Sequence, residues 1–159
     1  MHAGDRAGAL DLLEANMAIS RETGITFFGP AMLGAIALAS DDPKRREEAL
    51  REAQTILDRG CVSQNYFRFY RDAIEVSLAM NEWDQADLYA TALEKYFHDE
   101  PMSWPSFIIA RGRALADFGR GRGGEATLAQ IRQLHAEATR LTMRSEQTRL
   151  EAALRLTPT

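Results

Sequence analysis

The sequence has a single cysteine, Cys61, among its 159 residues, so no disulfide can form within the chain, which fits a reducing compartment. Valine is also scarce and occurs only at positions 62 and 76, whereas alanine, leucine, glutamate and arginine are abundant. These abundant residues lose little side-chain freedom when they enter a helix. The composition therefore predicts an all-α protein.

Long apolar runs and a strong charge of one sign are missing as well. The longest nearly apolar stretch, residues 25–39, contains a Gly-Pro pair and is shorter than the roughly 20 residues that a membrane span requires. The net charge is −4, from 19 basic and 23 acidic side chains, so no strongly basic surface is available for nucleic acid. We therefore expect neither membrane insertion nor nucleic-acid binding.

The sequence contains no recognisable catalytic motif, because it lacks both a G-x-S-x-G string and a P-loop. His98 stands beside Asp99 and Glu100, but adjacent residues of a helix cannot converge on one metal ion or one proton. Cys61 has no neighbouring histidine that could act as its base. We therefore expect packing or surface roles for these side chains, with no catalytic residue, no metal and no cofactor.

Apolar residues recur at steps of three and four over residues 9–19, which is the pattern of one helix face. Asp42 before Pro43 predicts a capped helix start, and Gly24, Gly60 and Gly119 are candidates for the left-handed residue after a helix end. Glycine and proline divide the rest of the chain into similar lengths. We expect helices over residues 5–22, 26–39, 43–58, 64–80, 84–97, 104–118, 124–140 and 143–156.

The predicted helices repeat in pairs. Their short connections make consecutive helices antiparallel, so that they form hairpins. Every second helix carries an early alanine at which two helix backbones can approach closely, namely Ala9, Ala49, Ala86 and Ala126. The spacings of 40, 37 and 40 residues predict an open solenoid and not a closed bundle.

Residues 70–93 resemble one tetratricopeptide (TPR) repeat. The positions that carry the resemblance are Tyr70, Ala73, Ile74, Ser77, Asn81, Trp83, Ala86, Ala90 and Leu93. The other units depart from the pattern, since Asn16 occupies a usually small apolar place and the period exceeds the roughly 34 residues of the consensus. We predict a TPR-like solenoid of antiparallel helical hairpins, with about eight helices in four pairs, forming one domain over residues 1–159.

Units of this length resemble the C-terminal TPR-like regions of bacterial class III adenylate/guanylate cyclases that carry an ATPase module. This resemblance rests on residues 4–19, on residues 111–116 and on residues 119–121. It implies a cytoplasmic signalling protein whose catalytic domain lies outside this chain. The first helix has the pattern of a repeat's second helix. We therefore expect a C-terminal fragment whose apolar face over residues 9–19 is partly uncovered and favours self-association.

The TPR resemblance also implies a binding groove. If the aromatic and alanine positions of the repeat face the core, then Arg68, Arg71 and Glu75 face the concave groove, with Asn65 one turn earlier. In this family that groove grips an extended peptide or a partner helix, and two arginines can hold a carboxylate or a phosphate. The alternative is that these side chains are solvated helix charges paired with each other and with Asp72.

Residues 119–124 contain a G-x-G-x-x-G string, which is typical of loops that bind dinucleotide phosphates. That chemistry requires a strand before the glycines, and the preceding residues are predicted to be helical. We expect a flexible connection, the alternative being an anion-binding loop that uses Arg120 and Arg122. For Trp104 we expect packing into its hairpin turn, the alternative being an exposed interface anchor.

Together these patterns favour a non-catalytic module that binds a protein, a peptide or other domains of a parent protein. A second hypothesis is a free-standing scaffold that forms homo-oligomers, with its groove occupied by a neighbouring copy. A third is a small enzyme that uses the arginine-rich loop. Residues 1–110 carry a net charge of −8 and residues 111–159 carry +4, which favours head-to-tail attraction between copies or docking on an acidic partner.

Overall fold

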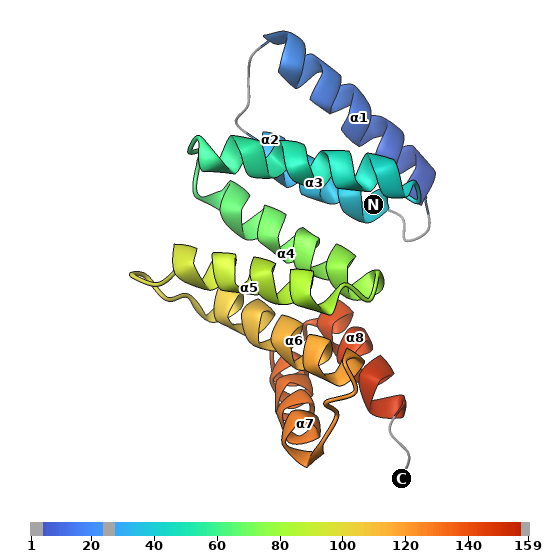
Figure 1. Cartoon of the computed structure of the whole chain (residues 1–159), viewed down its shortest axis with the longest axis vertical. Helices are drawn as coiled ribbons and strands as arrows, with labels where there is room; N and C mark the ends of the chain where they lie inside the picture. Colours follow the sequence, from blue (N-terminus) through green and yellow to red (C-terminus); the bar gives the residue numbers. More distant parts are fainter. Residues whose placement is uncertain (1–4, 24–27, 157–159) are drawn as a thin grey trace. The chain divides into compact units, whose positions relative to one another are not determined.

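The computed structural model describes residues 5–23 and 28–156, and these residues form eight helices and no strand (Figure 1). The helices are α1 (Arg6–Thr23), α2 (Gly29–Ala39), α3 (Pro43–Asp58), α4 (Gln64–Ala79), α5 (Trp83–Tyr96), α6 (Ser103–Gly119), α7 (Glu125–Arg140) and α8 (Arg144–Arg155). The all-α prediction is confirmed, and each predicted boundary lies at most three residues from the observed one. None of these described helices has the length and apolarity needed to cross a bilayer.

Two of the predicted helix boundaries have the expected chemistry. Asp42 caps α3, because its carboxylate accepts a hydrogen bond of 3.0 Å from the backbone N–H of Lys44, and Pro43 occupies the first turn. Gly60 follows α3 with a φ of 89°, a left-handed value that favours glycine. Gly24, the third candidate, lies outside the described residues.

The role predicted for Gly119 is wrong. Gly119 is the last residue of α6, and the left-handed position falls two residues later, at Gly121, where φ is 79°. A different constraint holds Gly119: a Cβ atom added there would lie 2.5 Å from the Cη2 atom of Trp83. The absence of a side chain therefore lets the end of α6 lie against the indole ring at the start of α5.

The chain falls into two compact units, residues 1–76 and 77–159, and the boundary between them lies inside α4. In the first unit α1 packs on α2, and α2 packs on α3. Gly34 permits a close approach of α2 to α4, since its Cβ position is 3.4 Å from the Cα atom of Phe69. The apolar core of this unit includes Met17, Leu33, Ile36, Ala49, Ala53, Leu57, Phe69, Ala73 and Ile74.

In the second unit each helix packs on the next, so that α5 contacts α6, α6 contacts α7 and α7 contacts α8. Helix α8 also contacts α6 directly. The core of this unit includes Ala86, Ala90, Leu93, Phe107, Ile108, Ala114, Ile131, Leu134 and Leu150. Helices that are neighbours in sequence are therefore neighbours in space within each unit, as a helical repeat requires.

The alanines expected at the helix crossings are only partly in place. Ala49 of α3 and Ala86 of α5 are fully buried, as expected. Ala9 is only half-buried and Ala126 is exposed, so the expectation for Ala126 is wrong. In α7, which packs against α6 and α8, the buried residues begin at Ile131, five positions after Ala126.

A buried ion pair joins α6 to α8. The Arg111 side chain is fully buried, and its Nε atom lies 2.9 Å from Oε2 of Glu146, whose side chain is also buried. Arg149 Nη1 and Ser145 Oγ donate to the other carboxylate oxygen at 3.0 and 3.2 Å. The contact between Arg111 Nε and Glu146 Oε2 is an ion pair without hydrogen-bond geometry. Because a buried charge is tolerated only beside an opposite charge, this pair holds α6 close to α8.

We predict that Glu146→Ala destabilises the protein strongly, because Arg111 loses its carboxylate partner inside the core. The expected loss in the free energy of unfolding is about 3 to 5 kcal/mol, measured by urea denaturation followed by circular dichroism. Glu125→Ala is the matched control, since Glu125 pairs with Arg132 at an exposed site, and its cost should stay below about 1 kcal/mol. Equal losses in the two variants would contradict a structural role for the buried pair.

A second prediction concerns Gly119→Ala. Although alanine favours helices, its methyl group would overlap the Trp83 ring, and we expect a net loss of about 1 to 3 kcal/mol in the free energy of unfolding. Gly124→Ala is the control, because nothing lies within 4 Å of a Cβ atom at that position. If the two variants are equally stable in thermal denaturation, the contact with Trp83 does not constrain the α5–α6 pair.

Candidate functional site

Asn65, one of the predicted groove residues, lies inside the first unit. Its side chain is fully buried. The amide oxygen accepts a hydrogen bond of 3.3 Å from the backbone N–H of Ala31 in α2, and the amide nitrogen donates to the carbonyl of Val62 at 3.2 Å. The residue therefore caps the first turn of α2 from α4, and its amide is not presented to solvent.

The other three predicted groove residues differ in exposure. Arg68 is exposed and makes no side-chain hydrogen bond or ion pair within the described residues. Arg71 is half-buried and donates to Asp72 at 2.7 and 2.8 Å, so part of its charge is neutralised on its own helix. Glu75 is 8% exposed. Of the four predicted residues, Arg68 alone combines an exposed side chain with an unengaged charge in the described structure.

The loop after α6 is held by its own acidic neighbours. Arg120 contacts three carboxylates: Asp84 at 2.6 Å, Asp87 at 2.6 Å and Asp117 at 3.3 Å. The hydrogen bond to Asp84, assisted by the one to Asp87, raises the pKa of Arg120 above its usual value. Arg122 also pairs with Asp117. Arg120 therefore ties the end of α6 to α5, whereas Arg122 pairs with the end of α6 itself, and both arginines of the anion-loop alternative already have carboxylate partners.

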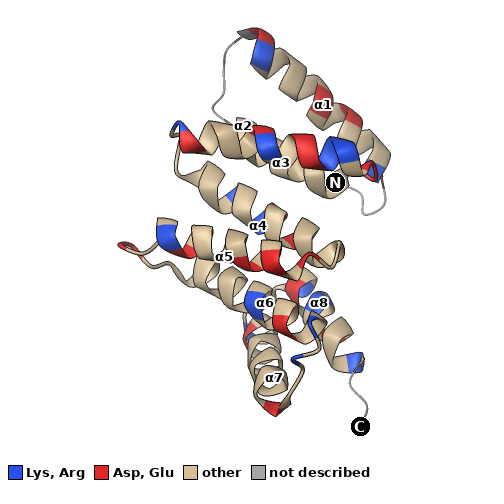
Figure 2. Cartoon of the chain, in the orientation of Figure 1, with Lys and Arg blue, Asp and Glu red and all other residues tan. Residues whose placement is uncertain are grey.

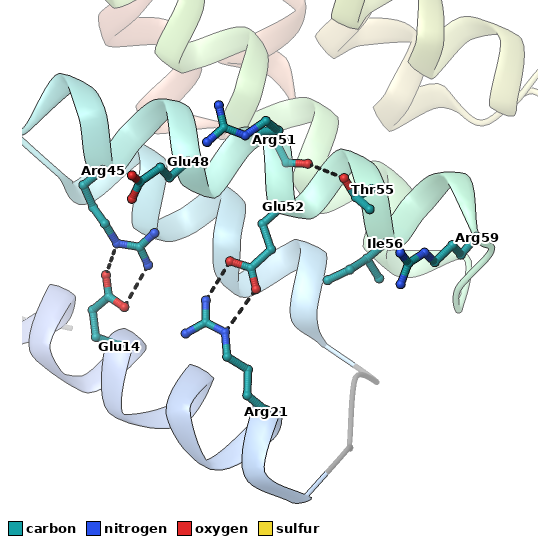
Figure 3. A pocket seen from close by; sticks show the side chains of 9 residues that line it. All are labelled: Glu14, Arg21, Arg45, Glu48, Arg51, Glu52, Thr55, Ile56 and Arg59. Atoms are coloured by element: carbon teal, nitrogen blue, oxygen red, sulfur yellow. Dashed lines mark hydrogen bonds and ion pairs between the residues drawn. The ribbon is translucent and has the colours of Figure 1, made fainter.

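A wide cleft lies between α1 and α3 and has a volume of about 810 Å³ (Figure 3). Two ion pairs, which lie side by side, span this cleft. Arg45 of α3 donates two hydrogen bonds to Glu14 of α1, at 2.6 and 2.8 Å. Arg21 of α1 donates two to Glu52 of α3, at 3.1 and 2.7 Å. Because each helix supplies one acid and one base, the pairs brace α1 against α3.

Four of the seven charged residues that line this cleft are therefore engaged with each other. Hydrogen bonds from Arg45 hold the pKa of Glu14 below its usual range, despite a small opposing contribution from burial. Figure 2 shows acidic and basic residues interspersed along α3, so no single sign dominates this surface. A ligand that bound between the two helices would have to break bidentate pairs. We therefore assign the cleft a bracing role in the first unit.

The second unit has a different kind of depression, which we call the α6 trough. It consists of two hollows, of about 500 and 400 Å³, that share Pro101, Ser106, Ala110 and Gln130. The larger hollow lies between α6 and α7, with Phe107 and Leu134 among its apolar residues. The smaller one extends toward the end of α5, where Phe97 and His98 line it.

The α6 trough offers both apolar and polar contacts. Met102 at its edge is 56% exposed, whereas Phe107 and Leu134 are 4% and 6% exposed. Gln130 and Gln133 lie one turn apart on α7, are exposed, and make no side-chain hydrogen bond within the described residues. An amide that is free to donate and to accept matches the alternating N–H and C=O groups of an extended peptide.

One end of the trough carries charge. Arg113 donates hydrogen bonds of 3.0 and 2.8 Å to Glu94 and one of 3.2 Å to the Thr91 hydroxyl. The hydrogen bonds from Arg113 lower the pKa of Glu94. This pair links α5 to α6 beside the smaller hollow, so the walls of the trough are held together where a ligand would lie.

The prediction of a packed Trp104 is wrong, since the residue is 46% exposed. Trp104 precedes the buried Phe107, Ile108 and Arg111 by three, four and seven positions, so it shares their face of α6, and its exposure is due to its place in the first turn. Analysis of the sequence also missed the α6 trough, which joins residues from three helices. The signal available was the pair of glutamines at i and i+3, Gln130 and Gln133.

Reactive side chains do not gather at either depression. Burial raises the pKa of the Cys61 thiol, which keeps it protonated and a weak nucleophile. Within residues 5–23 and 28–156 no group of three or more histidine, cysteine, aspartate or glutamate side chains could hold a metal ion.

Comparison of the chain with protein-family models, with curated proteins and with solved structures finds no significant match. The resemblance to TPR repeats and to the cyclase-linked regions therefore stays a prediction from the residues that carry it.

We predict that Glu14→Gln removes a pH-dependent part of the stability. Because the folded pKa of Glu14 is lowered, its ion pair stabilises fully above the usual glutamate pKa, and this contribution is lost as the pH falls through the lowered value. Since both partners are partly exposed, the variant should lose less than about 1 kcal/mol at neutral pH.

Urea denaturation of both proteins at neutral pH and in acid measures this difference. The gap between wild type and Glu14→Gln should close in acid, because the wild-type carboxylate is then protonated. Glu47→Gln is the control, since its ion pair with Arg51 is mostly exposed and should contribute little at either pH. A gap of equal size at both pH values would show that charge is not the source.

Proposed function

We propose that this chain is a non-catalytic helical-repeat module that binds an extended peptide segment of a partner protein. The observation that carries the proposal is the α6 trough, where apolar surface lies beside two unengaged amides on one face of the second unit. Recognition of an extended chain needs hydrogen-bonding groups for its backbone and hydrophobic hollows for alternate side chains. The trough supplies both.

The rigidity of the trough supports the same proposal. Helices α5, α6 and α7 all contribute to it, and their packing is fixed by buried residues such as Leu93, Ile108 and Ile131. A pre-formed groove loses less entropy on binding than a flexible one. The cleft between α1 and α3 is a weaker candidate, because Arg21 already pairs with Glu52 and Arg45 with Glu14 across the gap.

The identity of the parent protein is a finer proposal, which rests on the resemblance alone. The TPR-like pattern of residues 70–93 and the cyclase-like segments at residues 4–19, 111–116 and 119–121 favour a regulatory region of a bacterial nucleotide cyclase or a related signalling ATPase, located in the cytoplasm. The peptide would then come from another domain of that protein or from a separate partner. Sequencing the complete reading frame tests this point.

We predict that peptides selected on the wild-type chain from a displayed random library lose at least tenfold in affinity on Ser106→Trp. Ser106 is exposed and lines both hollows, so an indole there fills the space in which a peptide would lie. The double variant Gln130→Ala/Gln133→Ala should lose roughly thirtyfold, because each amide contributes about 1 kcal/mol through its hydrogen bonds. Dissociation constants are measured by fluorescence anisotropy.

Ala126→Trp is the matched control. It introduces the same side chain at an exposed position of α7 that lines neither hollow, and it should leave the affinity unchanged. Circular dichroism confirms that each variant remains folded. If no peptide is enriched, or if enriched peptides bind Ser106→Trp as well as wild type, the α6 trough is not the binding site.

A further inference from the structure

The outer face of α1 is an exposed apolar stripe with acidic residues along one edge. Leu12 and Ile19, seven residues apart, are 68% and 58% exposed, and Ala15 between them is exposed too. Asp11 and Glu22 lie on one side of this stripe, eleven residues apart, and neither makes an ion pair within the described residues. Large exposed apolar side chains beside unpaired charges are typical of an interaction surface.

The outer face of α8 has the opposite charge and small side chains. Arg144 and Arg155 are exposed and, like the two acids of α1, lie eleven residues apart, which is about 16 Å along a helix. Ser145 and Ala152 are exposed and lie seven residues apart, as Leu12 and Ile19 do. The α8 face therefore offers room for two large side chains beside two positive charges.

The charged pair lies on the same side of the large or small pair in both helices. In α1, Asp11 directly precedes Leu12, and Glu22 follows Ile19 by three positions. In α8, Arg144 directly precedes Ser145, and Arg155 follows Ala152 by three positions. When two such helices pack antiparallel, the charged edge of one helix lies beside the charged edge of the other. In a parallel pair the two charged edges would lie on opposite sides of the contact.

We propose that α1 of one copy of the chain packs antiparallel on α8 of a second copy. In this arrangement Asp11 meets Arg155, and Glu22 meets Arg144. Leu12 and Ile19 then lie about two residues, or roughly 3 Å, along the axis from Ala152 and Ser145, so each large side chain packs beside a small one. The matched charge and spacing are what select a second copy as the occupant, because both halves of the contact are present on this one sequence.

The donors needed for this contact are available. Arg144 makes no ion pair within the described residues. Arg155 has one hydrogen bond of 2.8 Å to Glu151, and its side chain is 78% exposed, so a guanidinium with five donors retains capacity for a second carboxylate. Exposed ion pairs are individually weak and a single helix pair buries little area. The association is therefore reversible and requires high protein concentration.

Sedimentation equilibrium of the full chain, from micromolar to millimolar concentration, tests the proposal. The average mass of wild type should rise with concentration, and the rise should become smaller at high salt because the ion pairs are screened. Asp11→Lys/Glu22→Lys and, separately, Arg144→Glu/Arg155→Glu should each weaken association at least tenfold. All four positions are exposed, and circular dichroism verifies that the variants fold.

The decisive measurement mixes the two charge-reversed proteins. The basic α1 of one then faces the acidic α8 of the other, so the mixture should associate about as strongly as wild type. Asp99→Lys/Glu100→Lys is the control, because it makes the same change in net charge at exposed residues outside both faces, and it should associate like wild type. A wild-type mass that stays at one copy, or a mixture that fails to associate, would overturn the proposal.

Discussion

The second unit depends on one buried ion pair between helices that are not consecutive. Helices α6 and α8 are separated in sequence by α7, yet Arg111 and Glu146 meet in the core at 2.9 Å. A buried guanidinium is tolerated only beside its carboxylate, so α8 cannot shift along α6 without exposing an unpaired charge to an apolar interior. The position of α7, which packs against both helices, is restricted by the same contact, and α7 in turn supplies one wall of the α6 trough.

Arginine–carboxylate pairing recurs in both units and decides which surfaces remain available for binding. In the first unit Glu14 and Arg21 join α1 to α3, and in the second unit Arg120 joins the end of α6 to α5. Each of these arginines is engaged by bidentate or multiple contacts, so the surfaces that look most charged in the sequence are structural braces. The α6 trough differs because its amides are not engaged by other described residues, and for that reason it is the surface proposed to bind a partner.

Much of the fold could be predicted because helix formation is local. The cap at Asp42, the left-handed Gly60 and the apolar periodicity of residues 9–19 act within one or two turns, and the predicted helix boundaries agree with the structure. Ala49 and Ala86, 37 residues apart, are both fully buried, as their places on the predicted helix faces require. The prediction of a single row of four hairpins stays a prediction, as do the TPR and cyclase relationships.

The sequence alone determined that the chain is helical, where each helix begins and ends, and that neighbouring helices pair, since these follow from propensity, capping and short connections. Only the tertiary structure decided that Asn65 is a buried cap, that Gly119 makes room for Trp83, that Arg120 has three carboxylate partners and that Trp104 is exposed. These outcomes depend on residues up to 36 positions away in the chain. A side chain's exposure and charge partners are fixed by which helices pack around it, and helical periodicity specifies only the direction in which it points.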